Sequence, residues 1–253
     1  MNIVITGASR GLGAALARHW AAPGVDLALI ARDAEALQQT AAACQAKGAS
    51  TRLATLDVRD AQAMAAQLLA WDAARPFDLV VANAGVTAGT RPDGSFEGPE
   101  AAARVIAVNL QGALNLVEPL LPRLTARRSG RVVLIASVAA FRGLPDSPSY
   151  CASKAGLWAY GESLRPLLAL RGVGLTNVAP GFFASAMSDR FIARQPMKMS
   201  AEAAAARIAA AVARGAGRCI MPRRLGWLLR GLELLPAPLA DRAVRLFRFH
   251  VAD

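Results

Sequence analysis

Short apolar runs alternate along this chain with longer, alanine-rich stretches. The runs are rich in Val, Ile and Leu, and there are seven of them, at residues 3–6, 26–31, 51–56, 79–82, 132–137, 174–178 and 218–221. Stretches with helical spacing separate them, such as 13–22, 33–47 and 60–74. Short, continuously apolar strands separated by helices are typical of a parallel sheet covered on both faces. We therefore predict an α/β fold with a doubly wound, seven-stranded parallel sheet in three α/β/α layers.

The domain organisation follows from length and patterning. The chain has 253 residues, of which 54% are hydrophobic, enough to bury one sizeable core. We predict that residues 1–221 form a single Rossmann-fold domain that carries the chemistry. Residues 222–253 are expected to form two short helices split by Pro236 and Pro238, with apolar residues alternating with arginines. Such a basic amphipathic extension packs on its own domain, on a partner subunit or on a membrane surface, and the sequence leaves these alternatives open.

The net charge of the chain indicates which classes of partner it can bind. The formal net charge is +11, and arginine supplies most of it, since the chain has only three lysines. This balance favours anionic partners such as phosphorylated cofactors, acidic proteins or membrane surfaces, unless it only reflects an arginine-rich proteome. The basic residues are dispersed and no aromatic platform accompanies them, so we expect no nucleic-acid partner.

Cysteine usage and the N-terminal residues indicate the compartment. Cys44, Cys151 and Cys219 are widely spaced and show no CxxC pattern, so we expect no disulfide, no metal site and a reducing environment. The chain starts on a β-branched run rather than a secretory signal, and we see no run of about 18 uncharged apolar residues that would predict a spanning helix. The expected location is cytoplasmic, with peripheral membrane contact through the tail as the alternative.

A glycine-rich turn, Thr-Gly-Ala-Ser-Arg-Gly-Leu-Gly, occupies residues 6–13, between the first predicted strand and a helix. Glycines there permit unusual backbone angles and let a pyrophosphate approach the backbone closely. The helix N-terminus adds N–H donors and a favourable dipole. We therefore predict a dinucleotide site whose contacts in this turn are Gly7, Ser9, Arg10, Gly11, Leu12 and Gly13.

The end of the second strand bears on which dinucleotide is bound. An acid commonly binds the ribose 2′-hydroxyl of NAD at this position. Here Arg32 follows the strand, and a guanidinium suits the 2′-phosphate of NADP, with Arg10 as a second cation. Asp33 lies at about the right distance for the acid, but we interpret it as the N-cap of the next helix. NADP(H) is therefore predicted over NAD(H).

Tyr150 and Lys154 form the candidate catalytic pair. They lie at i and i+4 of a helix expected over about residues 148–170, so they share one face. A nearby ammonium favours the phenolate, so we expect Tyr150 to be a usable acid or base near neutral pH. Ser137 ends the fifth predicted strand, where its hydroxyl can bind a substrate oxygen or simply satisfy the backbone. Neither histidine of the chain lies at the C-terminal end of a predicted strand.

In their order along the chain, these residues resemble the short-chain dehydrogenase/reductase family from Asn2 to about Met221. The resemblance rests on the turn 6–13, Asp57 after the third strand, Asn83-Ala84-Gly85 after the fourth, Asn109 between Val and Leu, Ser137, the YxxxK of Tyr150 and Lys154, and Pro180-Gly181. The separation of thirteen between Ser137 and Tyr150 also fits the family.

The resemblance implies an oxidoreductase that reduces a carbonyl to an alcohol, or the reverse. Tyr150 would transfer the proton, and Lys154 would lower its pKa and bind the nicotinamide ribose. Ser137 would hold the substrate oxygen, and Asn109 would hold a water in a proton relay to Lys154. Asp57 would bind the adenine amino group. The implied cofactor contacts beyond the turn are Asp57, Val58, Asn83, Ala84, Gly85, Tyr150, Lys154, Pro180, Gly181 and Ser185.

The chain departs from the family pattern in three places. Ala82 stands where the family has a first asparagine, and Ser185 replaces a threonine but keeps a hydroxyl. The tail beyond Pro222 is longer than in minimal members and could cover the strand edge that the usual tetramer uses. We therefore expect a homodimer through helices near 110–124 and 149–170, with a tetramer as the alternative.

The segment 186–200 is expected to form a substrate lid. It contains Met187, Phe191, Ile192, Met197 and Met199. An apolar lid suggests a lipophilic or acyl-chain substrate, unless these side chains belong to the core. A non-catalytic dinucleotide-binding sensor or scaffold is the alternative function, although the chain retains all four residues of the family's catalytic set.

Overall fold

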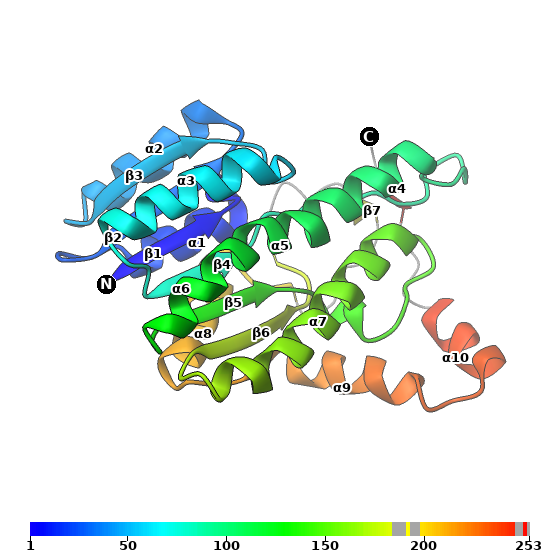
Figure 1. Cartoon of the computed structure of the whole chain (residues 1–253). Helices are drawn as coiled ribbons and strands as arrows, with labels where there is room; N and C mark the ends of the chain where they lie inside the picture. Colours follow the sequence, from blue (N-terminus) through cyan, green and yellow to red (C-terminus); the bar gives the residue numbers. More distant parts are fainter. Residues whose placement is uncertain (184–190, 193–197, 246–249, 252–253) are drawn as a thin grey trace.

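The computed structural model describes residues 1–183, 191–192, 198–245 and 250–251 (Figure 1). The main sheet has seven strands in the order β3-β2-β1-β4-β5-β6-β8, all parallel to their neighbours. The strands are β1 (Asn2–Thr6), β2 (Asp26–Ala31), β3 (Ser50–Thr55), β4 (Leu79–Ala82), β5 (Arg131–Ile135), β6 (Gly174–Pro180) and β8 (Arg218–Met221). The predicted doubly wound parallel sheet is confirmed, and the carboxyl ends of all its strands meet at one edge.

Helices cover both faces of this sheet. One face carries α1 (Gly11–Trp20), α2 (Ala34–Gln45) and α8 (Ala201–Ala213). The other carries α3 (Ala61–Ala74), α7 (Pro148–Ala169) and a helical stretch made of α4 (Pro99–Ile106), a π-helical turn (Ala107–Gln111), α5 (Gly112–Val117), a 3-10 turn (Glu118–Leu120) and α6 (Leu121–Ala126). Figure 1 shows the sheet between these two helical layers.

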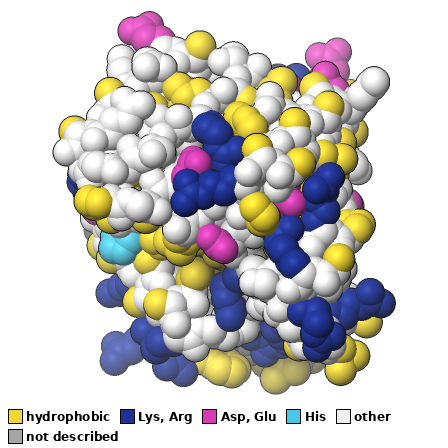
Figure 2. Space-filling view, turned by 60° about the vertical axis from the view of Figure 1, so that its left-hand side comes forward, with side chains coloured by type: hydrophobic (Ala, Val, Ile, Leu, Met, Phe, Trp, Pro, Cys, Tyr) yellow, Lys and Arg dark blue, Asp and Glu magenta, His cyan; other side chains and the backbone are white. Residues whose placement is uncertain are grey.

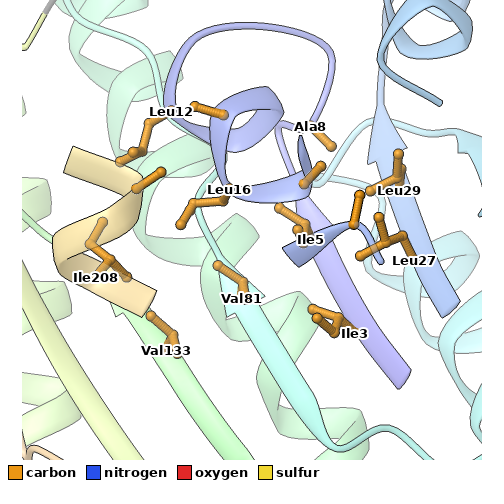
Figure 3. Close-up of a cluster of buried hydrophobic side chains, with 14 of the residues drawn as sticks. Ile3, Ile5, Ala8, Leu12, Leu16, Leu27, Leu29, Val81, Val133 and Ile208 are labelled. Atoms are coloured by element: carbon orange, nitrogen blue, oxygen red, sulfur yellow. The ribbon is translucent and has the colours of Figure 1, made fainter. Parts of the chain in front are cut away.

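The core is split by the sheet because successive strand residues point to opposite faces. Ile3 and Ile5 of β1 join the cluster under α1 and α8, while Val4 joins the cluster under α3 and α7. Figure 3 shows Leu16 of α1 and Ile208 of α8 against the first of these clusters. Burying each such side chain stabilises the fold by roughly 1.5–3 kcal/mol.

The stretch Pro99–Ala126 is long and apolar enough to cross a membrane by length and composition alone. Half of its most apolar window is buried inside the fold. Leu116, Leu120 and Leu124 are fully buried against the sheet. This stretch therefore occupies the place of an ordinary core helix.

The tail continues from β8 into α9 (Arg223–Leu232) and α10 (Ala237–Val244). Two helices were expected, but only Pro236 separates them, because Pro238 lies in the first turn of α10, where proline is tolerated. Leu225, Leu229 and Leu232 of α9 are buried in a third cluster with Phe141 and Trp158. The strand β7 (Phe191–Ile192) pairs antiparallel with β9 (His250–Val251), a contact that the sequence analysis does not predict.

Candidate functional site

The glycine-rich turn links β1 to α1 with two residues in the left-handed region, Gly7 at φ +65° and Gly11 at φ +56°. Gly13 is required for a different reason. A Cβ at Gly13 would lie 2.2 Å from the carbonyl oxygen of Gly7 and 2.5 Å from Nδ2 of Asn83. Because Gly7 contributes backbone atoms there, no side chain at residue 13 fits without moving the turn.

Asn83 fixes the turn to the sheet. Its Nδ2 donates to the carbonyl oxygens of Thr6, at 2.9 Å, and Gly7, at 3.2 Å. The hydroxyl oxygen of Thr6 accepts from the backbone N–H groups of Asn83 and Ala84, both at 3.2 Å. The ends of β1 and β4 are thereby joined beside the predicted pyrophosphate site.

A cavity of about 80 Å³ lies at the carboxyl ends of the strands. Six residues predicted to contact the cofactor line it, namely Gly7, Arg32, Asp57, Val58, Ala84 and Gly85. Four further residues that the sequence did not single out complete the lining, namely Ala31, Leu56, Val86 and Val108. The glycine turn leaves its backbone open to close approach at Gly7 and Gly13, and the adjoining cavity offers apolar walls next to charged groups, as one end of a dinucleotide site requires.

Charged residues at this end of the site differ from the expectation in one respect. Asp57 pairs with Arg59, whose Nη2 lies 2.7 Å from Oδ2, and the hydrogen bond from Arg59 lowers the pKa of Asp57. Nη1 of Arg32 lies 3.9 Å from the same oxygen, and the Arg32 side chain is 58% exposed. The sequence analysis does not predict a role for Arg59, whose only signal is its place two residues after Asp57.

Asp33 caps α2 by accepting from the N–H of Ala36 at 3.1 Å, which confirms its interpretation as a helix N-cap.

The helix α7 places Tyr150 and Lys154 together, as predicted. Nζ of Lys154 lies 5.8 Å from the centre of the Tyr150 ring and donates to the carbonyl oxygen of Ile135 at 2.8 Å. The lysine is 4% exposed, and burial lowers its pKa to about 8.

The expected lowering of the Tyr150 pKa is not what the structure gives. Burial raises the pKa of Tyr150 to about 12, and hydrogen bonding with Ser137 only partly opposes this. Lys154 is not among the groups that shift it. The physical reason is that removing the phenol from water disfavours the phenolate, and a buried amine whose own pKa is lowered contributes less positive charge. In this environment Tyr150 is a protonated donor at neutral pH.

Ser137 lies beyond the strand rather than at its end, because β5 stops at Ile135. Its Oγ accepts from the N–H of Ala139 at 3.1 Å and donates to the carbonyl oxygen of Pro180 at 3.4 Å. The serine thus caps the 3-10 turn Val138–Ala140 and also brings the predicted Pro180-Gly181 segment beside the catalytic group.

Asn109 is fully buried in the π-helical turn. Its Oδ1 accepts from the N–H of Val86 at 2.7 Å, and its Nδ2 donates to the carbonyl oxygen of Val86 at 2.9 Å and to Oγ of Ser153 at 3.0 Å. A Cβ at Gly85 would lie 3.4 Å from Oδ1 of Asn109 and 3.5 Å from Nζ of Lys154. Gly85 therefore lies where the polar groups of α7 and of the π-helical turn approach each other. Turns of π-helix are frequent at functional sites.

Some residues that were predicted for the cofactor site or the substrate lid cannot be placed in the site described above. Ser185 and the lid residues Met187 and Met197 lie outside the described residues. Met199 is partly buried against the cluster under α1 and α8, so for this residue the core alternative applies. Within the described part of the chain, no three His, Cys, Asp or Glu residues are arranged to hold a metal ion.

The largest described cavity, about 880 Å³, flanks the site without containing it. Its walls include Ala139 and Cys151, the near neighbours of Ser137 and Tyr150, but none of the four predicted catalytic residues. Arg142 crosses this region and pairs with Glu233 at 3.5 Å and Asp241 at 2.5 Å, which ties the tail to the segment after Ser137.

Known proteins are similar to this chain in sequence and in fold. A sequence model of the short chain dehydrogenase family matches residues 1–196. An uncharacterized oxidoreductase of Myxococcus xanthus (strain DK1622) is 35% identical over 97% of this chain and 96% of its own length. The ketoacyl reductase HetN of Nostoc sp. (strain PCC 7120 / SAG 25.82 / UTEX 2576) is 34% identical over 72% of this chain and 63% of its own length.

Solved structures agree. A short-chain dehydrogenase from Sphingobium yanoikuyae in complex with NADPH matches with a TM-score of 0.79 and 25% identity, over 87% of each chain. A short chain dehydrogenase/reductase from Burkholderia phymatum in complex with NAD gives a TM-score of 0.81 and 26% identity, over 90% of this chain and 91% of the other. This chain belongs to the short chain dehydrogenase family and is an oxidoreductase of alcohol or carbonyl groups that uses a nicotinamide dinucleotide.

Proposed function

We propose that the protein reduces a lipophilic carbonyl compound to an alcohol with NADP(H) as cofactor. The observation that carries this proposal is the approach of Asn109 and Lys154 to Gly85, at the rim of the cavity that Arg32 and Asp57 line. The polar groups for proton transfer and the predicted cofactor contacts thus share one edge of the sheet.

Each residue has a distinct part in this scheme. The nicotinamide supplies the hydride when the cofactor is bound. Tyr150 donates the proton to the carbonyl oxygen, and a pKa raised to about 12 keeps it in the donor form at neutral pH. Ser137 hydrogen-bonds the same oxygen, Lys154 binds the ribose, and Asn109 holds the water through which Lys154 exchanges protons. The protonated phenol is the form that carbonyl reduction requires.

The preference for NADP(H) rests on the arginines. Arg32 lines the cavity, Arg10 is exposed at the start of α1, and Asp33 is engaged as a helix cap rather than offered to a ribose hydroxyl. Relatives of similar likeness bind NADPH or NAD, so the preference must come from these side chains. Arg32→Ala should lower kcat/KM for NADPH by tenfold or more, roughly the loss of one or two charge-assisted hydrogen bonds, and leave that for NADH unchanged. A wild-type preference for NADH would refute this assignment.

The catalytic assignment is tested with the two tyrosines of the chain. Tyr150→Phe should lower the rate of NADPH oxidation across a panel of ketones by roughly 10²–10⁴-fold. Tyr160→Phe is the matched control, because the hydroxyl of Tyr160 on α7 donates to Glu118 of the 3-10 turn and to none of the site residues. Turnover that survives Tyr150→Phe would refute the mechanism. Tight NADPH binding without turnover of any ketone by the wild type would favour a dinucleotide sensor instead.

Two finer points belong to the same proposal. The apolar sequence of the lid, and the name ketoacyl reductase given to one relative, support an acyl-chain substrate, so kcat/KM should rise with chain length in a series of ketones. Exposed Leu167 of α7 lines a cavity of about 660 Å³ between α6 and α7, and exposed Leu170 follows the last turn of α7. These residues support a homodimer through this face. Leu167→Glu should then reduce the mass measured by light scattering to that of one chain.

A further inference from the structure

The outward surface of α9 and α10 is unusually apolar. Trp227 is 63% exposed and Leu234 is 87% exposed. Leu228, Leu235 and Leu239 are also exposed, so five large apolar side chains face outward within one short segment. The helix α9 can pack on the domain and still expose apolar side chains. Leu225, Leu229 and Leu232 form its buried face, and the helical period places Trp227 on the opposite face. Several large apolar side chains exposed within one segment are typical of an interaction surface.

Beside this surface lies a cavity of about 410 Å³, where the edge strand β8 meets the end of α8 and the start of α9. Four arginines line it together with Trp227, namely Arg214, Arg218, Arg223 and Arg230. No acidic residue is part of this lining. Several arginines around one cavity suit an anion of the phosphate type, which accepts several charge-assisted hydrogen bonds at once. We call this cavity the arginine pocket.

Neighbouring contacts hold two of these arginines in place. Arg218 pairs with Glu162 behind the pocket. The guanidinium of Arg230 stacks over the rings of Phe141, at 4.2 Å from the centroid, and Trp158, at 5.4 Å. These contacts hold Arg218 and Arg230 in place before an anion binds, while Arg214 and Arg223 are exposed to solvent.

Charge complementarity decides between occupants. A second copy related by a two-fold axis along β8 would bring the same arginines face to face, which is unfavourable. An acidic protein would satisfy the arginines but would leave the five exposed apolar side chains without a reason. A membrane surface accounts for both features, because basic amphipathic helices bury tryptophan and leucine at the headgroup level while arginines contact lipid phosphates.

The lower edge of the molecule agrees with this arrangement. Figure 2 shows Lys and Arg side chains along the lower edge of the molecule with hydrophobic side chains between them. We propose that α9, α10 and the arginine pocket form a docking surface for an anionic lipid bilayer, with a lipid phosphate in the arginine pocket and Trp227, Leu228 and Leu234 in the interfacial layer.

The test is sedimentation of the full chain with vesicles. Vesicles of phosphatidylcholine with phosphatidylglycerol should pellet the protein, vesicles of phosphatidylcholine alone should not, and salt should weaken the binding. Arg214→Glu with Arg223→Glu should weaken binding by about tenfold or more. Trp227→Ser with Leu228→Ser should also weaken it and should abolish any blue shift of tryptophan emission on vesicle addition.

A matched control changes charge elsewhere by the same amount. Arg104→Glu with Arg171→Glu replaces two exposed arginines away from α9 and α10, and this variant should bind vesicles like the wild type. Thermal unfolding of each variant verifies that it is folded. Equal binding to both kinds of vesicle, or an equal loss in the control, would overturn the proposal. So would an oligomer dissociated by Trp227→Ser with Leu228→Ser in a protein that ignores vesicles, because a second copy would then cover this surface.

Discussion

Replacing Lys154 by methionine should stabilise the fold while abolishing turnover. Burial lowers the pKa of Lys154 from 10.5 to about 8. That difference of about 2.5 pKa units means that the charged amine destabilises the folded state by about 3 kcal/mol. Methionine removes this penalty but leaves the carbonyl of Ile135 without its lysine donor, which costs about 1–3 kcal/mol. At pH 7 we therefore expect Lys154→Met to gain about 1 kcal/mol in the free energy of unfolding.

The dependence on pH is the sharper test. Between pH 8 and 10.5 the unfolded chain binds more protons at Lys154 than the folded chain does, so the stability of the wild type rises with pH across this window. The variant lacks this group. The stability difference between variant and wild type should therefore be constant below pH 8 and should fall by about 2–3 kcal/mol by pH 10.

Urea unfolding at pH 7, 8, 9 and 10 measures this difference directly. Lys47→Met is the control, since Lys47 is exposed, and its stability difference from the wild type should not change in the same way. A flat difference for Lys154→Met over the whole range would show that the buried amine carries no such penalty. NADPH oxidation by the same protein should be absent, because the lysine is part of the proposed proton relay.

Three further changes test two ion pairs of the fold and the glycine turn of the site. Asp72→Ala should destabilise the chain by about 3–5 kcal/mol in urea, because Arg127, which binds the buried carboxylate through two 3.0 Å contacts, would lose its partner. Gly13→Ala should weaken NADPH binding in a fluorescence titration by tenfold or more, since the added carbon would displace the turn. Glu162→Gln should remove a contribution to stability that is lost in acid. Burial opposes ionisation of Glu162, but hydrogen bonds from Arg218 and Arg165 outweigh burial and lower its pKa to about 2. The stability of the wild type should therefore fall between about pH 4.5 and 2, while that of the variant changes less.

Each of these has a contrary outcome. Loss of stability below 1 kcal/mol for Asp72→Ala would mean that solvent reaches Arg127 in the folded state. Gly143→Ala is the control for the turn, because nothing lies within 4 Å of a carbon added there, and equal weakening of NADPH binding by both variants would refute the steric argument. Identical acid unfolding of Glu162→Gln and the wild type would show that the ion pairs of Glu162 do not contribute to stability.

The sheet was predictable because its signal is local. Each strand is a short apolar run, and every run named from the sequence falls on an observed strand to within two or three residues. The N-cap at Asp33 was also readable, since a side chain three residues from its partner is encoded locally. The resemblance supplied Asn109, a position that composition and spacing alone do not single out.

The remaining features depend on residues far apart in the chain. The pKa of Tyr150 is set by how completely the fold removes the phenol from water, which an i,i+4 pattern does not contain. The arginine pocket joins α8, β8 and α9. Such contacts arise only when the elements pack, so sequence periodicity gives no sign of them.

The ion pairs of Arg142 have a consequence for anyone who shortens or transplants the tail. Glu233 and Asp241 both neutralise this one guanidinium, which belongs to the segment that follows Ser137. A chain cut after β8 would leave Arg142 without these two acids, five residues from the proposed oxygen-binding serine. The tail is therefore not a detachable appendage, and a chimera that carries it to another family member should carry the arginine with it.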